Sequence, residues 1–223
     1  MGQGLGRLFA PDDRDRKFLL PPRPEATEIT ERYWWSVGVL DQGDEPTCVG
    51  FSVFKWLTTG PITNRPPFSP KDVYRGAQAN DEWPGEDYDG SSVRGAFKWL
   101  KSTGYVTSYR WAFDAELAMQ HVLTTGPVVL GTNWYGSMFS TDSYGFLRPR
   151  GSIVGGHAYL VVGANRNYVC PDGTKGALRI VNSWGRSFGQ KGRAWLSVAD
   201  ADRLIKEDGE AATSDEVLMR SES

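Results

Sequence analysis

The two halves of this chain differ in local pattern, and that difference constrains the fold more than any other feature of the sequence. Four helices are expected before Pro127, because each segment follows a capping residue and ends near glycine or proline. These are Cys48 to Leu57, Ser69 to about Ala79, Ser91 or Ser92 to about Gly104, and Asp114 to Leu123. After Pro127 the β-type runs are Val128–Leu130, His157–Val162, Ala177–Val181 and Arg193–Ser197, with a hairpin expected over Asn165–Gly176. Helices followed by strands predict an α+β fold with two lobes and a cleft between them.

The division into domains follows from the same pattern. Residues 1–34 are expected to form an extended arm, because Pro21, Pro22 and Pro24 favour extended backbone, with Phe18 to Leu20 as its anchor. Residues 35–223 are expected to form one domain, with a helical lobe at about 35–126 and a β-rich lobe at about 127–223. We interpret the arm as a strap that holds the lobes; regulation of access to the cleft is the alternative.

Composition excludes several classes of function. The chain has 25 basic and 27 acidic residues, a balance that favours neither nucleic acid nor an anionic membrane as a partner. No stretch approaches the roughly 18 apolar residues of a membrane helix, and the glycine-rich start lacks the apolar core of a signal peptide. We therefore expect a cytoplasmic protein; association with a virion, or release by a non-classical route, stays open.

The cysteines and histidines number two each, namely Cys48, Cys170, His121 and His157. Two cysteines are too few for a disulfide framework, although a bridge between them stays open on counting alone. Their spacing gives no metal-ligand set, so neither a metal nor another cofactor is expected.

Cys48 stands at the expected start of the first helix. Unpaired N–H groups and the positive end of the helix dipole favour a thiolate there, which lowers the pKa of the thiol. Taken alone, a small buried residue on an apolar helix is the more common role of such a cysteine.

His157 and Asn182 each occupy the end of an expected strand. His157 follows Gly155 and Gly156, a setting in which the backbone can approach a ligand closely. Asn182 begins the run Asn-Ser-Trp-Gly after a strand, and its side chain can fix the orientation of an imidazole. Trp184 could cover that hydrogen bond from water. A structural histidine and an ordinary turn are the alternatives.

Together these motifs resemble the papain-like family of cysteine peptidases. The order Cys48, His157, Asn182 matches that family, and Gln42 precedes Cys48 by the six positions at which the family places its oxyanion glutamine. The resemblance covers about residues 35–200 and is strongest to bacterial and phage-type members. It implies a two-lobed fold with the active site in the cleft, a thiolate mechanism without cofactor, and a protein or peptide substrate. It also implies that Asp89, Gly90 and Trp184 line the substrate site.

Several residues depart from the family pattern. Pro46 and Thr47 replace the usual Gly-Ser or Gly-Ala before the cysteine, and 109 positions separate Cys48 from His157, fewer than the roughly 130 of the best-known members. We expect no long inhibitory propeptide. Alternatives that remain open are a catalytically silent binding protein, and an amidase acting on peptidoglycan or isopeptide bonds. A dedicated partner protein, the cleavage mode and the oligomeric state are not fixed by the sequence.

Overall fold

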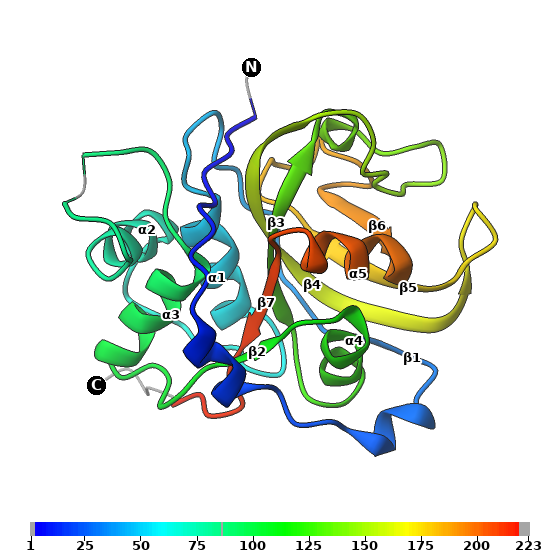
Figure 1. Ribbon diagram of the computed structural model, residues 1–223, viewed down its shortest axis with the longest axis horizontal. Helices are drawn as coiled ribbons and strands as arrows, with labels where there is room; N and C mark the ends of the chain where they lie inside the picture. The colour runs from blue at the N-terminus through cyan, green and yellow to red at the C-terminus, as the bar shows by residue number, and fades with distance from the viewer. Residues whose placement is uncertain (1–2, 86, 219–223) are drawn as a thin grey trace.

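The computed structural model describes residues 3–85 and 87–218. Figure 1 shows three helices on one side, and on the other a twisted sheet with two further helices packed against it. The helices of the first half are α1 (Cys48–Thr58), α2 (Pro70–Gln78) and α3 (Val93–Ser102), followed by α4 (Ala115–Thr124). A fifth helix, α5 (Val198–Lys206), lies near the C-terminus. The four predicted helices are therefore confirmed within a few residues. Among these residues, no helix is long and apolar enough to cross a membrane.

Three of the helices begin at the caps that their sequences predict. Ser69 forms a capping box with Asp72, Ser92 accepts a hydrogen bond from the Gly95 N–H, and Asp114 accepts one from the Leu117 N–H. Thr47 stands at the cap position of α1, but its side chain makes no capping bond there. The first amides of α1 are therefore not capped by the residue that precedes Cys48.

The sheet has seven strands in the order β2-β7-β3-β4-β5-β6, with β1 paired to β4. Its longer members are β3 (Val128–Tyr135), β4 (Ile153–Val169) and β5 (Lys175–Val181), followed by β6 (Arg193–Ser197). The shorter ones are β1 (Glu31–Tyr33), β2 (Arg110–Ala112) and β7 (Glu210–Thr213). All the paired strands are antiparallel. The expected hairpin at 165–176 is the tip of β4 and β5, whose turn contains Gly173 at φ 83°.

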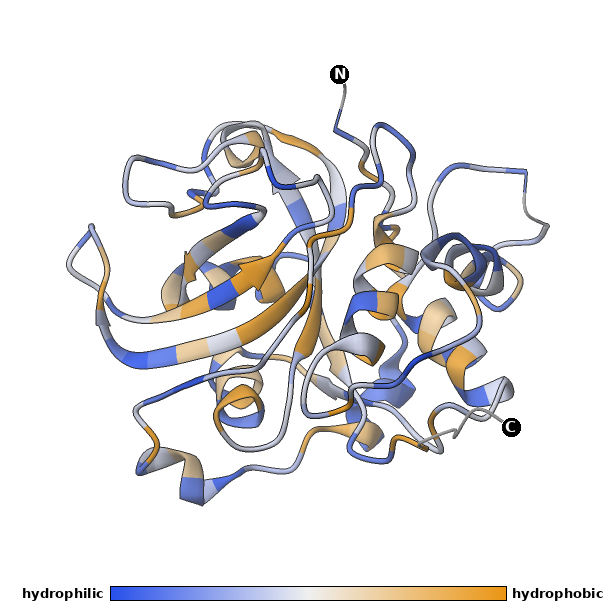
Figure 2. Ribbon diagram, turned by 180° about the vertical axis from the view of Figure 1, so that it is seen from behind, coloured by the Kyte–Doolittle hydropathy of each residue, from blue (hydrophilic) through white to orange (hydrophobic). Residues whose placement is uncertain are grey.

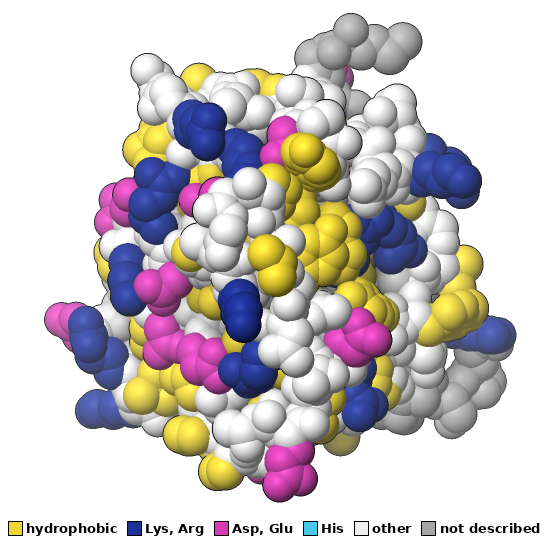
Figure 3. All heavy atoms as spheres, turned by 90° about the vertical axis from the view of Figure 1, so that its right-hand side faces the viewer, with side chains coloured by type: hydrophobic (Ala, Val, Ile, Leu, Met, Phe, Trp, Pro, Cys, Tyr) yellow, Lys and Arg dark blue, Asp and Glu magenta, His cyan; other side chains and the backbone are white. Residues whose placement is uncertain are grey.

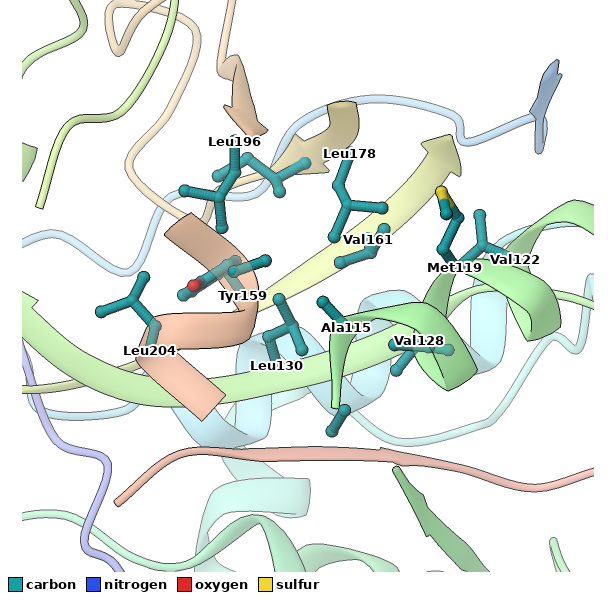
Figure 4. Close-up of a cluster of buried hydrophobic side chains, with 14 of the residues drawn as sticks. Ala115, Met119, Val122, Val128, Leu130, Tyr159, Val161, Leu178, Leu196 and Leu204 are labelled. Carbon is teal, nitrogen blue, oxygen red and sulfur yellow. The ribbon is translucent and has the colours of Figure 1, made fainter. Parts of the chain in front are cut away.

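The central strands separate two hydrophobic cores, because alternate side chains point to opposite faces. Val128 and Leu130 of β3 join the core beneath α4 and α5, whereas Val129 between them joins the core of α1, α2 and α3. Figure 4 shows the first core, where side chains of α4 and α5 meet those of β3, β4, β5 and β6. Figure 2 shows the same segregation of apolar residues onto the strands and inner helix faces. The predicted α+β fold with two lobes is confirmed.

Residues 3–30 run along the molecule as two short 3-10 turns (Asp13–Phe18 and Pro24–Thr27) joined by extended chain. In Figure 1 the first, dark-blue part of this segment descends between the helices and the sheet, and the rest crosses the bottom of the view toward β1. Leu20 and Ala26 are part of the core beneath α4, so Leu20 is an anchor as predicted. Phe18 and Leu19, by contrast, are 51% and 41% exposed. Of the expected anchor Phe18–Leu20, only the last residue is buried.

Candidate active site

Cys48 is the first residue of α1 and is fully buried where the two lobes meet. Its thiol lies near three backbone amides, those of Ala158 on β4, Gly6 in the N-terminal segment, and Val49. Burial nevertheless raises the pKa of this thiol to about 11, which outweighs the opposite effect of the amides. In this arrangement Cys48 is a thiol, not the thiolate that a helix N-terminus alone would favour.

His157 and Asn182 are brought together by the pairing of β4 with β5. Leu160 lies opposite Val181 in this antiparallel pair, so the residue after β5 reaches back toward His157. The Nε2 atom of His157 lies 2.8 Å from Oδ1 of Asn182. Since the amide oxygen can only accept, Nε2 carries the proton and donates. Within the described chain, Nδ1 of His157 is buried without a hydrogen-bond partner. That nitrogen is left free for a proton from elsewhere.

The imidazole of His157 is enclosed by aromatic rings. Trp184 stacks on it with ring centroids 4.4 Å apart, and Trp134 approaches it edge-on at 4.7 Å. Desolvation by this packing lowers the pKa of His157 to about 4, while the contact with Asn182 acts in the opposite direction. His157 is therefore a neutral base at neutral pH. The sequence predicts that His157 opens a strand. In the structure that strand, β4, begins at Ile153, so His157 lies inside it.

Gln42 lies beside these residues and is held by its neighbours at both ends of its amide. Its Oε1 accepts a hydrogen bond from the Ser183 hydroxyl at 2.6 Å, and its backbone N–H donates to the Ser183 carbonyl. Its Nε2 donates to the carbonyls of Gly4 at 3.2 Å and Glu45 at 2.7 Å. The Gln42 side-chain N–H group therefore points into the cleft at a fixed position, where it already donates to the Gly4 peptide carbonyl.

The predicted substrate-lining residues lie at different places. Trp184 is in the cleft, where its Nε1 donates to the same Gly4 carbonyl at 3.2 Å. Gly90 is buried at the rim with φ 98°, and a Cβ there would lie 2.5 Å from the Gly6 carbonyl oxygen. The main-chain bonds at this rim come instead from the next residue, Ser91. Asp89 is exposed.

The N-terminal segment Gly4–Leu8, called the plug below, fills the cleft between the lobes. On the helical side, the Ser91 N–H donates to the Gly6 carbonyl, and the Leu8 N–H donates to the Ser91 carbonyl. On the sheet side, the amides of Gly6 and Arg7 both donate to the Gly156 carbonyl, at 3.1 and 3.0 Å. The plug therefore covers Cys48 and joins the two rims by main-chain hydrogen bonds.

Comparison with known proteins shows which fold places these residues in this way. No family model and no curated protein matches the sequence. Among solved structures, the chain is similar to xylellain, a cysteine protease from Xylella fastidiosa, with a TM-score of 0.66 at 18% identity over 100% of this chain and 98% of that one. It is similar to procathepsin L2 from Tenebrio molitor larval midgut (TM-score 0.66, 16% identity, 95% and 78% covered). Procathepsin B S9 from Trypanosoma congolense gives a TM-score of 0.66 at 14% identity, covering 96% and 87%. The chain has the papain-like fold.

Sequence reasoning missed the polar groups that complete this papain-like cleft. Ser183 positions Gln42, and Glu210 on β7 forms a buried ion pair with Arg7, whose Nε lies 3.0 Å from Oε1. Burial raises the pKa of Glu210, and Arg7 acts against that shift. Ser183 sits inside the Asn-Ser-Trp-Gly run, which was a usable signal. Nothing local marked Glu210, because its role depends on a residue 203 positions away.

The second cysteine and histidine lie outside the cleft. Cys170 is a free thiol in a small cluster with Phe146 and Ala177, whereas Cys48 is a free thiol in the core of the helical lobe. The disulfide that counting left open is therefore not formed. His121 is buried on α4, and Oγ1 of Thr213 lies 3.4 Å from its Nε2. Among the described residues no cluster of His, Cys, Asp or Glu is placed to hold a metal ion.

Proposed function

We propose that this chain is a cysteine peptidase that hydrolyses peptide bonds, with Cys48 as nucleophile, His157 as base and Asn182 as the residue that orients the base. One observation carries the proposal: the Asn182 contact fixes the proton of His157 on Nε2 and leaves Nδ1 buried and unpartnered on the sheet side of the cleft that holds Cys48. A base in this tautomer, adjacent in sequence to the Ala158 amide that contacts the Cys48 thiol, suits nucleophilic acyl transfer.

The reaction would proceed in two halves. The Cys48 thiol gives its proton to Nδ1 of His157 and its sulfur forms a bond with the scissile carbonyl carbon. The imidazolium then protonates the departing amine as the C–N bond breaks, leaving a thioester. In the second half His157 takes a proton from water and the hydroxide attacks the thioester carbon. The C–S bond then breaks to release the carboxylic acid product, and the proton returns from His157 to the sulfur. Atoms and charge balance without a cofactor.

The oxyanion of each tetrahedral intermediate would be held by Gln42. Its Nε2 already donates to the Gly4 carbonyl in the cleft, which stands where a substrate oxygen would be bound. The backbone N–H of Cys48, at the uncapped start of α1, is the second donor. Such donors stabilise charge that develops only in the transition state.

Replacement of Cys48 by alanine tests the proposal. Hydrolysis of a labelled unfolded protein is measured under reducing conditions for the parent chain and for a Gly6→Ala variant. In that variant the added Cβ would lie 2.0 Å from the Pro46 carbonyl oxygen, so the plug no longer fits. Each of the two proteins is compared with the same protein carrying Cys48→Ala. We expect hydrolysis that disappears with Cys48→Ala while thermal unfolding is unchanged. If Cys48 of the Gly6→Ala variant reacts rapidly with iodoacetamide but neither protein hydrolyses the substrate, the proposed function is wrong.

A further inference from the structure

Phe18, expected from the sequence to be an anchor, is exposed and lines a hollow on the helical side of the molecule. It is the last residue of the 3-10 turn Asp13–Phe18 and is 51% exposed. The hollow measures about 400 Å³ and lies between this turn, α3 and the chain before β2; it is called the α3 hollow below. None of the candidate catalytic residues lines it. A hollow of this volume can hold a small organic ligand.

One wall of the α3 hollow is already fixed by buried contacts. In Figure 1 the dark-blue 3-10 turn lies beside α3, and Nη1 of Arg94 donates to Oδ1 of Asp15 across the two elements at 2.6 Å. The same guanidinium donates to the Ala10 carbonyl at 2.7 Å and lies over the ring of Trp111. Arg94 is 4% exposed. A ligand would therefore meet a preorganised wall, which lowers the cost of binding.

Basic residues outnumber acidic ones around the α3 hollow. Its charged lining consists of Arg14, Arg94, Lys98 and Lys101 against Asp12 and Asp15. The two carboxylates pair with Arg14 and Arg94. Lys98 pairs with Glu82, whose Oε1 lies 2.8 Å from Nζ. Within the described chain, Lys101 forms no hydrogen bond and no ion pair. The ammonium group of Lys101 is therefore the charge left without a counter-charge at this hollow.

Two aromatic side chains line the same hollow. Tyr109 contacts the rings of Phe97 and Trp111, whereas Phe18 makes no ring contact with the described residues. The Tyr109 hydroxyl has no hydrogen-bond partner in the described part of the chain. Burial raises the pKa of Tyr109, so this hydroxyl stays protonated at neutral pH and can donate. An unpacked ring, a free hydroxyl donor and the free ammonium of Lys101 therefore line one hollow.

A neighbouring hollow differs in the sign of its charge. It measures about 320 Å³ and shares Arg94 with the α3 hollow, but five acidic residues and three basic ones line it. An anion would be repelled there, so of these two hollows only the α3 hollow suits one.

We propose that the α3 hollow binds a small aromatic carboxylate, with its ring against Phe18 and Tyr109 and its carboxylate on Lys101 and the Tyr109 hydroxyl. Such a ligand buries the exposed ring and pairs the uncompensated charge. It would hold the turn Asp13–Phe18 against α3. The site is separate from the candidate active site and does not depend on the proposed function.

Calorimetric titration of the full-length protein with 2-naphthoate tests the proposal. We expect one molecule bound per chain, with an affinity lowered about 10-fold by Phe18→Ala and about 5-fold by Lys101→Gln. Both residues are exposed, so thermal unfolding without ligand should be unchanged. Leu19→Ala and Lys175→Gln are the matched controls, because both side chains are exposed and neither lines the hollow. These controls should bind 2-naphthoate as the parent chain does.

The neutral analogue 2-naphthamide tests the need for a negative charge. It should bind about 5-fold more weakly than 2-naphthoate, and added salt should weaken only the carboxylate. Equal affinity for the two compounds would refute the charge requirement. Absence of 2-naphthoate binding, or equal affinity in Phe18→Ala, Lys101→Gln and the two controls, would overturn the whole proposal.

Hydrogen exchange locates the bound ligand. The Asp15 N–H donates to the Asp12 carbonyl at the start of the 3-10 turn, so 2-naphthoate should slow its exchange while the amides of β1 stay unchanged. Slower exchange at Gly6 or Ser91 instead would place the ligand in the cleft and contradict the proposal. None of these measurements uses hydrolysis, so their outcome is independent of whether the chain is a peptidase.

Discussion

At the scale of single residues, one amide oxygen holds the candidate base in place. Oδ1 of Asn182 accepts both from Nε2 of His157 at 2.8 Å and from the Ser183 N–H at 2.7 Å. The backbone bond fixes the amide, so the amide in turn fixes the imidazole ring. Trp184 and Trp134 then exclude water from this contact, which strengthens it. Orientation of His157 thus comes from groups that would not themselves react.

Gln42 allows a direct test of oxyanion stabilisation. Gln42→Ala should lower kcat by about 10²–10³-fold with little change in KM, because the lost donor acts on charge present only in the transition state. Steady-state kinetics in the Gly6→Ala background measures this without interference from the plug.

Ser183→Ala is the informative companion of that variant. It keeps the Gln42 amide but removes the 2.6 Å bond that holds its oxygen. We expect a smaller loss of kcat than for Gln42→Ala, and the double variant should be no slower than Gln42→Ala alone. Additive losses would mean that Ser183 acts by another route.

At the scale of elements, what the sequence predicted depended on whether the signal was local. The helices beginning after Ser69, Ser92 and Asp114 were predicted because each cap lies within three residues of the amide that it binds. The strand β7 has the sequence Glu-Ala-Ala-Thr, which lacks β-branched or aromatic periodicity until its last residue; it is a strand because β2 and β3 pair with it.

The same distinction applies to the site and to the missed helix. Gln42, Cys48, His157 and Asn182 were predicted from short motifs, whereas the plug was not, since its glycines acquire meaning only against Glu45 and Pro46. The helix α5 was missed although Ser197 and Asp200 form a local cap at its start. That signal was present in the sequence and went unused.

At this scale the N-terminal segment, residues 3–30, allows a prediction about stability. Leu20 is 2% exposed and packs in the core beneath α4, whereas its neighbour Leu19 is 41% exposed. Leu20→Ala should lower the free energy of unfolding by about 2–5 kcal/mol, and Leu19→Ala by less than about 0.5 kcal/mol. Denaturant unfolding of the two variants measures the difference. Similar small losses in both would show that the N-terminal segment contributes little to the stability of the fold.

At the scale of the whole molecule, the two lobes are joined in two places: through the central strands β3 and β4, and through the main-chain hydrogen bonds of the plug. Strands β3 and β4 supply side chains to both cores, so relative movement of the lobes would disturb both. The outer surface carries acidic and basic side chains interspersed around an apolar patch, as Figure 3 shows for one face. No large region of one charge is present on that face to attract a polyanion.

Stability of the whole molecule should depend on pH through the buried histidines. Burial lowers the pKa of His157 and of His121 from 6.5 to about 4. Between these values the unfolded chain binds more protons than the folded one, so the free energy of unfolding falls as pH drops from 6.5 to 4. Each histidine contributes up to about 3 kcal/mol to this loss.

A variant isolates the contribution of the catalytic histidine. His157→Gln removes one titrating group, so its unfolding free energy should fall less steeply than that of the parent chain between about pH 6.5 and 4. Glu210, whose pKa burial raises, acts in the opposite direction, since its folded form binds the extra proton and loses stability as pH rises. It is present in both proteins and cancels from the comparison. Parallel curves would mean that His157 is solvated in solution and that its burial does not contribute to the pH dependence of stability.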